Sequence, residues 1–298
     1  MSSKKDETIP RATGLLVIEV KNSNPNGDPD RESDPRQRSH DQRGVVTGVS
    51  FKRKVRDLID NRDGEVWRQL ANGRKADEHD ILEARRHKRT ELEKLLNTNF
   101  DEFKKRFWDA RVFGNTFLEK NGEDTIRTGV AQFVLGTSIA PIRIERLTMT
   151  KMAPAQGAKE GGEAPTRGMA PLGYRVVEHG VYCMPFFINP TAAIKSGCTA
   201  PDIALLLKII RYAYPHTASH IRPFVEVRHA WYGQHKDTLG SFSEFRFVEA
   251  MTPIKKQDPE KPSTSWADYD VPTSLPKDLQ DRVTNFCDLC ITLPAWVS

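Results

Sequence analysis

A short apolar run followed at once by a long polar stretch constrains the fold of this chain more than any other feature. Residues Gly14 to Val20 read Gly-Leu-Leu-Val-Ile-Glu-Val, a β-branched run of strand length that ends at a cluster of Asn, Pro and Gly. From Lys21 to Gly44 there is almost no apolar residue, which predicts a long polar loop. Loops of this length are usually functional or disordered. We therefore expect a central strand that leads into a long polar loop.

An amphipathic helix is predicted directly after the loop. Apolar residues recur at helical spacing from Phe51 to Ile59, and either Thr47 or Ser50 can cap the first turn. Lys52 then projects off the apolar stripe together with its basic neighbours. The predicted helix is thus apolar on one side and basic on another.

Basic residues are concentrated in the loop and this helix. Positions 36 to 56 hold seven basic residues against one acidic residue, an excess of six, whereas the whole chain has 45 Lys and Arg against 40 Asp and Glu. A helix that offers Lys52 and Arg56 one turn apart can grip successive phosphates of a nucleic acid without reading bases. A solvated helix face beside a mobile basic loop explains the same charges equally well. Charge alone leaves both interpretations open.

Composition limits the class of protein. A chain of 298 residues is long enough to bury a core without covalent staples. Its four cysteines are too few for a dense disulfide framework, which indicates a reducing compartment. The start is polar, and no apolar run approaches the roughly 18 residues that a membrane span needs. We therefore expect a cytoplasmic protein without a membrane partner.

The remaining residues alternate between helical and strand patterns. The spacing of Leu and Phe predicts two charged helices between Asp80 and Arg111, split near Asn97 to Asn99. A segment rich in Gly and Pro, Met149 to Gly173, should protrude between two flanking strands. The other expected elements are a helix at 201–212 and strands at 129–138, 142–147, 174–188, 224–232 and 242–251. This order predicts an α+β domain on an antiparallel sheet, with a helical insertion and a projecting arm.

Several motifs occur in the order found in one protein family. They are Asn24-Pro-Asn-Gly-Asp-Pro-Asp30 with Pro35-Arg36, Gly44 to Arg56, Asp109 to Gly114, Gly129 to Phe133 with Ser138 to Pro141, and Met169 to Tyr182. Together they span about the first two-thirds of the chain and closely resemble the Cas-seven (Cas7) backbone family of type I CRISPR complexes, nearest to subtypes B and C. The segment 62–111 and the tail beyond 252 carry no motif that matches.

The resemblance implies one hand-shaped domain over residues 1–298. Its palm would be ferredoxin-like, of the RNA-recognition-motif (RAMP) type, with a helical finger insertion and a protruding thumb hairpin. In this sequence the palm core would comprise residues 14–60, 125–148 and 174–252. The finger would comprise 61–124, the thumb arm 149–173, and a C-terminal segment 253–298.

The resemblance also implies a function. Members of the family bind CRISPR RNA as repeating backbone subunits, polymerise along it, and do not cut it. The expected partners are the guide RNA, further copies of the chain in a helical filament, the target DNA strand, and Cas subunits of the Cas-five and Cas-eight type. Copy number, guide length and the recruitment of a nuclease do not follow from the motifs.

Site residues carry over from the motifs position by position. Lys52, Arg53 and Arg56 would hold phosphates, while Asn24 and Asn26 would shape the palm loop that presents Arg36. Further residues would line the RNA path or the thumb: Arg111, Gln132 and Ser138 for the path, and Arg167 and Met169 for the thumb. An apolar wedge such as Met169 or Met152 can replace the stacking lost when a base step opens, although a Met also serves to pack an arm.

The carboxylates of the loop have a rival interpretation. Asp28, Asp30, Glu32 and Asp34 alternate as in a calcium loop, but Ser33 stands where that loop requires Gly. The alternative is a metal-dependent RNA endonuclease that uses Asp28 and Asp30, as in type III relatives. Turn formation by Asp and Asn explains the same residues, and we favour it.

Cysteine and histidine spacings complete the candidates. Cys287-x-x-Cys290 is half a zinc site, and His216 and His220 have an i, i+4 spacing that suits a ligand pair. The two cysteines lie among apolar residues, which indicates burial, and no second Cys-x-x-Cys accompanies them. We therefore expect neither a metal nor another cofactor.

Overall fold

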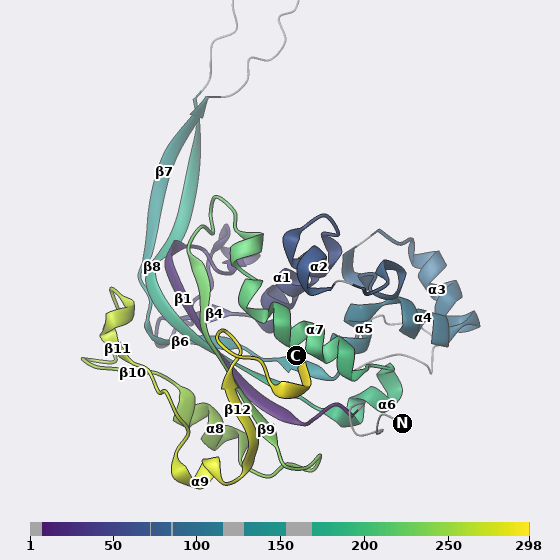
Figure 1. Ribbon diagram of the computed structural model, residues 1–298. Helices are drawn as coiled ribbons and strands as arrows, with labels where there is room; N and C mark the ends of the chain where they lie inside the picture. The colour runs from purple at the N-terminus through teal and green to yellow at the C-terminus, as the bar shows by residue number, and fades with distance from the viewer. Residues whose placement is uncertain (1–7, 72, 85, 116–127, 153–168, 298) are drawn as a thin grey trace, which may run out of the picture.

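The computed structural model describes residues 8–71, 73–84, 86–115, 128–152 and 169–297. One antiparallel sheet organises them, with strands in the order β12-β9-β1-β8-β6-β4, and β5 and β7 also pair with β8 (Figure 1). The strands of this sheet are β1 (Ala12–Ser23), β4 (Arg43–Val46), β5 (Ala131–Phe133), β6 (Gly136–Pro141), β7 (Ile144–Met152), β8 (Met169–Ile188), β9 (Val225–His235) and β12 (Val283–Asp288). Two small hairpins pair β2 (Gly27–Asp28) with β3 (Asp34–Pro35), and β10 (Ile254–Lys255) with β11 (Tyr269–Asp270).

β1 is the central strand that the apolar run predicts. It pairs with β8 on one side and with β9 on the other. Alternate side chains of a strand point to opposite faces. Leu16 and Ile18 belong to the larger core on one face, while Leu15 and Val17 pack on the other face against Phe247. Burial on both faces explains why the run is continuously apolar.

Helices cover both faces of the sheet. The larger core receives α1 (Gly48–Asp60) and α7 (Ala200–Ile209), which lie on one face. The second core receives α8 (Glu244–Met251) and α9 (Lys277–Gln280). The other helices are α2 (Glu65–Leu70), α3 (Arg89–Thr98), α4 (Phe100–Arg106), α5 (Trp108–Phe113) and α6 (Ala193–Ser196). The chain is thus α+β with a mainly antiparallel sheet, as expected from the order of elements.

The predicted strand at 242–251 is wrong, because this segment forms α8. Ser243 accepts a hydrogen bond from the backbone N–H of Arg246 and caps the helix. Phe247 and Met251, one turn apart, are fully buried, whereas Phe245 is exposed. The apolar residues therefore follow the helical period, and the density of aromatic residues in a short run obscured it.

The expected pair of charged helices between 80 and 111 is three helices. Asn99 ends α3 and caps α4, as the predicted split near 97–99 implies. A second break occurs at Phe107, which pairs with Asp80 in an isolated parallel bridge and separates α4 from α5. The side chain of Phe107 is buried with Leu92, Leu96 and Phe103 in a small core of this helical segment.

The expected strand at 129–138 is also divided. β5 and β6 both pair with β8, but the pairing is interrupted between them. Val134 donates to the carbonyl of Pro185 there, and Pro185 has no N–H to return a bond. A proline of the partner strand thus splits one predicted strand into two.

β7 and β8 form a long hairpin that projects from the body of the molecule (Figure 1). Their register runs from Ile144 opposite Val177 to Met152 opposite Met169. The paired strands therefore extend into the segment that its Gly and Pro content marks as a protrusion. Arg167 lies outside the described residues, and for Met169 the structure describes the backbone only. Within the described ranges, none of the helices has the length and apolarity required to span a membrane.

Candidate functional site

The polar loop is tied to the first turn of α1. Oδ1 of Asn26 accepts hydrogen bonds from the backbone N–H of Thr47 at 2.9 Å and from its hydroxyl at 3.0 Å. Thr47 in turn accepts from the N–H of Ser50 at 3.2 Å, which makes Thr47 the N-cap. A side chain on Gly48 would meet the carbonyl oxygen of Phe133 at 2.0 Å, so the helix begins in direct contact with β5. Asn26 thereby sets where α1 starts.

Asn24 and Arg36 hold the loop in shape. Nδ2 of Asn24 is buried and donates to the carbonyl of Ser33 at 2.7 Å. Arg36 forms an ion pair with Asp28 at 3.5 Å, and both side chains are half-buried. Asp28 also accepts a bond from the N–H of Asp30 at 3.3 Å, the turn geometry expected of Asp in a loop.

The other loop carboxylates contact the projecting hairpin. Asp34 forms ion pairs with Arg175 of β8 at 3.0 Å and with Arg146 of β7 at 3.4 Å. Glu32 pairs with Arg175 as well. Within the part of the chain that is described, no group of three or more Asp, Glu, His or Cys lies close enough to hold a metal ion. The acidic loop is therefore joined by ion pairs to the base of the hairpin.

A cleft of about 370 Å³ lies between α1, the end of α5 and the strand β5. Cationic, amide and apolar side chains share its wall. The lining residues are Val49, Lys52, Arg56, Glu83, Phe113, Gly114, Asn115, Thr128 and Gln132. Three of the sequence-predicted residues, Lys52, Arg56 and Gln132, are thus brought together from segments far apart in the chain.

Lys52 is a partly desolvated cation in the cleft wall. Its ammonium donates to Oε1 of Gln132 at 3.4 Å and lies 5.3 Å from the centre of the Phe113 ring. Burial, and then the nearby Arg56 charge, lower the pKa of Lys52 to about 8. Gln132 donates to the carbonyl of Gly129, which fixes its orientation. An anion in this cleft would restore the full charge of Lys52.

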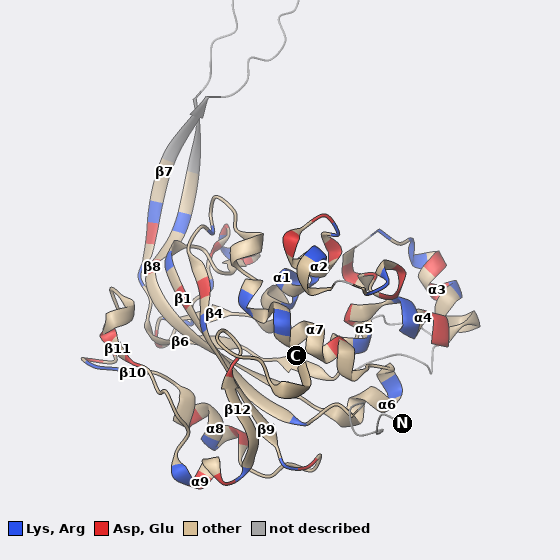
Figure 2. Cartoon of the chain, in the orientation of Figure 1, with Lys and Arg blue, Asp and Glu red and all other residues tan. Residues whose placement is uncertain are grey.

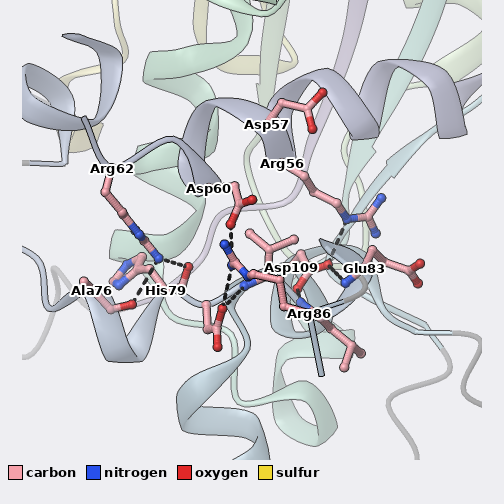
Figure 3. Close-up of polar contacts among 12 residues, drawn as sticks. Arg56, Asp57, Asp60, Arg62, Ala76, His79, Glu83, Arg86 and Asp109 are labelled. Atoms are coloured by element: carbon pink, nitrogen blue, oxygen red, sulfur yellow. Dashed lines mark hydrogen bonds and ion pairs between the residues drawn. The ribbon is translucent and has the colours of Figure 1, made fainter. Parts of the chain in front are cut away.

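Arg56 is held rigidly in the cleft wall (Figure 3). Its Nε donates to Asp109 at 2.8 Å, and the guanidinium lies 5.2 Å from the ring centre of Phe113. Asp109 also accepts from the N–H of Leu82 at 2.8 Å, so this carboxylate cannot swing away. Among the described residues, the Nη atoms of Arg56 have no hydrogen-bond partner, and they stay available to a ligand.

Three of the expected RNA contacts lie elsewhere. Arg53 is exposed and pairs with Asp57 one turn along α1. Arg111 is buried and binds both carboxylate oxygens of Asp202, at 2.9 and 3.0 Å. Ser138 is buried, where it accepts from the N–H of Gly44 and donates to a nearby carbonyl. In this structure Arg111 and Ser138 have structural partners and do not line the cleft.

Most charges of the basic segment are neutralised locally. Arg38 and Arg43 both pair with Asp41, and Arg36, Arg53 and Arg56 have the acidic partners described above. Within the described residues, Lys52 and Lys54 of this segment have no ion-pair partner. Figure 2 shows the resulting mixture of positive and negative residues around α1 and the hairpin base. The sequence count of six excess charges therefore overstates the free charge.

Two residues missed by the sequence analysis stand out. Asn115 lines the cleft, but a lone Asn after Gly114 carries no signal in the sequence. Phe224 is 67% exposed, and its carbonyl accepts from the N–H of Lys21 at the end of β1. It borders a second cleft of about 330 Å³ with Pro223. An aromatic residue that follows Arg-Pro at the end of a loop is a usable signal in the sequence. The expected strand at 224–232 includes Phe224, whereas β9 begins at Val225.

The cysteine and histidine spacings form no common site. Burial raises the pKa of Cys287 to about 11 and that of Cys290 to about 12, and both pack against the larger core. The rings of His216 and His220 contact separate tyrosines, Tyr212 and Tyr174 respectively. These residues thus serve packing in the structure.

Comparison with solved structures finds several chains that are similar to this one. The chain is similar to a chain of a CRISPR RNA-guided surveillance complex in the pre-nicking state, with 14% identity over 75% of each chain and a TM-score of 0.44. It is similar to a chain of another CRISPR RNA-guided surveillance complex, with 13% identity over 83% of this chain and 77% of that one and a TM-score of 0.44. A chain of the type III-B Cmr-beta complex bound to cognate target RNA has 11% identity, covers 74% and 60% of the two chains, and has a TM-score of 0.36.

A search of curated proteins returns no match to the chain. The model of the family described as CRISPR-associated protein Cas7 matches residues 10–274, which is most of the sequence. This match confirms the resemblance inferred from the ordered motifs. The chain therefore belongs to the CRISPR-associated protein Cas7 family.

Proposed function

We propose that this chain is a non-catalytic backbone subunit that binds CRISPR RNA in a type I, subtype B- or C-like, surveillance complex of antiviral defence. The observation that carries the proposal is the cationic cleft beside α1 in a member of the Cas7 family. Lys52 there has no carboxylate partner among the described residues, and its lowered pKa reflects a desolvated charge that a phosphate would stabilise. The protein would act in the cytoplasm.

The topology supports a ferredoxin-like palm of the RNA-recognition-motif type. The order β1, α1, β6, β8, α7, β9 along the chain is strand-helix-strand-strand-helix-strand, and the corresponding strands lie side by side as β9-β1-β8-β6. In this proposal, the helical segment 61–124 is the finger and the hairpin with the arm 149–173 is the thumb. Arg167 and Met169 remain thumb candidates by resemblance, and residues 253–298 form the C-terminal segment.

RNA would cross the surface at the start of α1. Lys52 and the free Nη atoms of Arg56 are available to phosphates, and Gln132 lies beside them. Phosphate contacts of this kind release counterions and do not read sequence. The exposed Phe224 offers a surface on which a base can stack, and it is adjacent to the loop that Asn24 and Asn26 shape.

Several copies would assemble head to tail along one guide RNA. A heterologous contact that does not close into a ring generates an open helix. The guide would pair with a target DNA strand, so sequence specificity would come from base pairing. Subunits of the Cas-five and Cas-eight type would complete the complex. The engagement of Asp28 with Arg36 supports a non-catalytic role, because that carboxylate already has a cationic partner.

The proposal is tested by identifying the nucleic acid that co-purifies with the protein. The chain is co-expressed with a CRISPR array and its partner subunits, purified, and the bound RNA is sequenced; CRISPR RNA should dominate. Lys52→Ala should reduce the retained RNA and flatten the salt dependence of binding, whereas Lys277→Ala, an exposed lysine of α9, should change neither. Recovery of random cellular RNA, or of none, contradicts the proposal. Cleavage of complementary RNA by the magnesium-loaded complex would contradict its non-catalytic part.

A further inference from the structure

The amide of Asn115 is a buried polar group without a partner. The residue lines the cleft beside α1 and is only 6% exposed. Within the described part of the chain, neither Oδ1 nor Nδ2 makes a hydrogen bond. Buried polar atoms in native proteins are nearly always paired, and each exception calls for an explanation. A ligand that enters the cleft can supply the missing bonds.

Described contacts fix the backbone directly before Asn115. Gly114 ends α5 with a φ of +75°, and its N–H donates to the carbonyl of Ala110 at 3.0 Å. A side chain on Gly129 would approach the nitrogen of Gly114 to 2.2 Å, so the two backbone segments touch. Gly129 also accepts from Gln132, which contacts Lys52. The backbone that carries the Asn115 side chain is therefore held at the edge of the cleft before any ligand arrives.

The unmet bonds specify the chemistry of the ligand group. The amide needs an acceptor for its N–H groups and a donor for its oxygen, and this holds whichever way the amide is turned. Phosphate oxygens only accept, and Lys52 and Arg56 already offer them donors in the same cleft. The ribose 2′-hydroxyl both donates and accepts, and it is present at every nucleotide of RNA. Base edges also do both, but a guide of arbitrary sequence presents no constant base.

We propose that Asn115 hydrogen-bonds the ribose 2′-hydroxyl of the RNA and makes the cleft selective for RNA over DNA. This inference rests on the proposed RNA-binding function and adds to it a residue that discriminates the sugar. Lys52 and Arg56 bind the phosphate regardless of the sugar, so affinity and selectivity come from different side chains of one cleft.

The experiment varies the Asn115 side chain and the ribose 2′-hydroxyl independently and compares the four affinities. Full-length wild type, Asn115→Leu and Gln69→Leu are titrated with single-stranded RNA and DNA of one sequence; Gln69 is an exposed amide on α2 and serves as control. Wild type should bind RNA roughly threefold to tenfold more tightly than DNA, the effect of about one net hydrogen bond. Asn115→Leu should lose that preference by weakening RNA binding alone, and Gln69→Leu should keep it.

Affinity for DNA is the internal reference, because the inference requires it to stay unchanged in Asn115→Leu. Equal losses for RNA and DNA, or an unchanged preference in Asn115→Leu, would overturn the inference. A second measurement needs no variant: RNA with 2′-O-methyl groups cannot donate, and wild type should bind it as weakly as DNA. If wild type binds this RNA as tightly as ordinary RNA, the inference is wrong. If wild type binds no RNA at all, the proposed function itself fails.

Discussion

Removing the guanidinium of Arg111 is expected to destabilise the fold and to leave the proposed RNA-binding cleft intact. Arg111 joins α5 to Asp202 in the first turn of α7, and the two side chains are only 7% and 4% exposed. Its Nη atoms also donate to the carbonyls of Lys104 at 2.7 Å, Lys105 at 2.6 Å and Glu78 at 3.0 Å. Burial alone would raise the pKa of Asp202, but Arg111 and the Thr199 cap outweigh it and hold that pKa below its usual range.

The expected loss of stability follows from the groups that lose their partner in Arg111→Met. The variant keeps much of the apolar stem but strands the Asp202 carboxylate without its cation, and breaking a buried pair in this way costs about 3–5 kcal/mol. Native domains are stable by about 5–15 kcal/mol, so the loss is a large fraction of the total. The matched control, Arg53→Met, removes an exposed pair with Asp57 one turn away and should cost about 0.3–0.5 kcal/mol.

Urea unfolding followed by tryptophan fluorescence measures both effects. In the double variant Arg111→Met with Asp202→Asn, the stranded charge is gone, so the loss should be smaller than the sum of the two single losses. RNA affinity is measured on the folded protein at low urea. A change of stability below about 1 kcal/mol for Arg111→Met, together with weaker RNA binding, would refute this reasoning and restore Arg111 to the RNA path.

Three further predictions concern the cleft, α8 and the hairpin. Burial sets the pKa of Lys52 near 8 in the free protein, and a bound phosphate raises it. The affinity for RNA should therefore fall as pH rises above about 8. Lys52→Arg stays charged, so its affinity should depend less on pH in binding titrations. Phe247→Ala should lower the free energy of unfolding in urea by about 3–5 kcal/mol, and Phe245→Ala should leave it almost unchanged. Similar losses for the two variants would indicate a strand, because residues 245 and 247 of a strand share a face. Asp34→Asn should speed hydrogen exchange at the hairpin base by removing two ion pairs, and high salt should shrink the difference from wild type. Unchanged exchange would show that these ion pairs do not hold the hairpin.

Local sequence patterns predicted correctly those elements whose surroundings in the fold favour the same structure as the local sequence does. The run from Gly14 to Val20 forms β1, and Thr47 caps α1 where the periodicity places the first turn. The strand at 242–251 failed because clustered aromatic residues resemble a strand, although their burial follows a helical period. The strand at 129–138 was divided by Pro185, a residue of another strand, which no local pattern reveals.

Only part of the candidate site was predictable, because local patterns reveal motifs and helical faces but not contacts between distant segments. The ordered motifs identified the family, and α1 carries Lys52 and Arg56 into one cleft with Gln132. Asn115 was missed, since a single amide becomes meaningful only when its burial and lack of partners are known. The acidic loop also gained its role from the structure, because its partners are arginines of a hairpin more than a hundred residues away.

The sequence by itself determined the family, the central strand, the capped basic helix and the protruding arm, because each depends on residues that are close together in the chain. Only the tertiary structure decided which basic residues are free to bind. Arg56 pairs with Asp109 and Arg111 with Asp202, at separations of 53 and 91 residues. A charge count cannot distinguish a paired cation from an unpaired one, because pairing depends on distance in space and falls off over a few ångströms. Of the seven basic residues of the loop and helix, Lys52 and Lys54 have no ion-pair partner among the described residues, and Arg56 keeps its Nη atoms unbonded. Folding brings Lys52 and Arg56 together with Gln132 and Asn115 in one cleft.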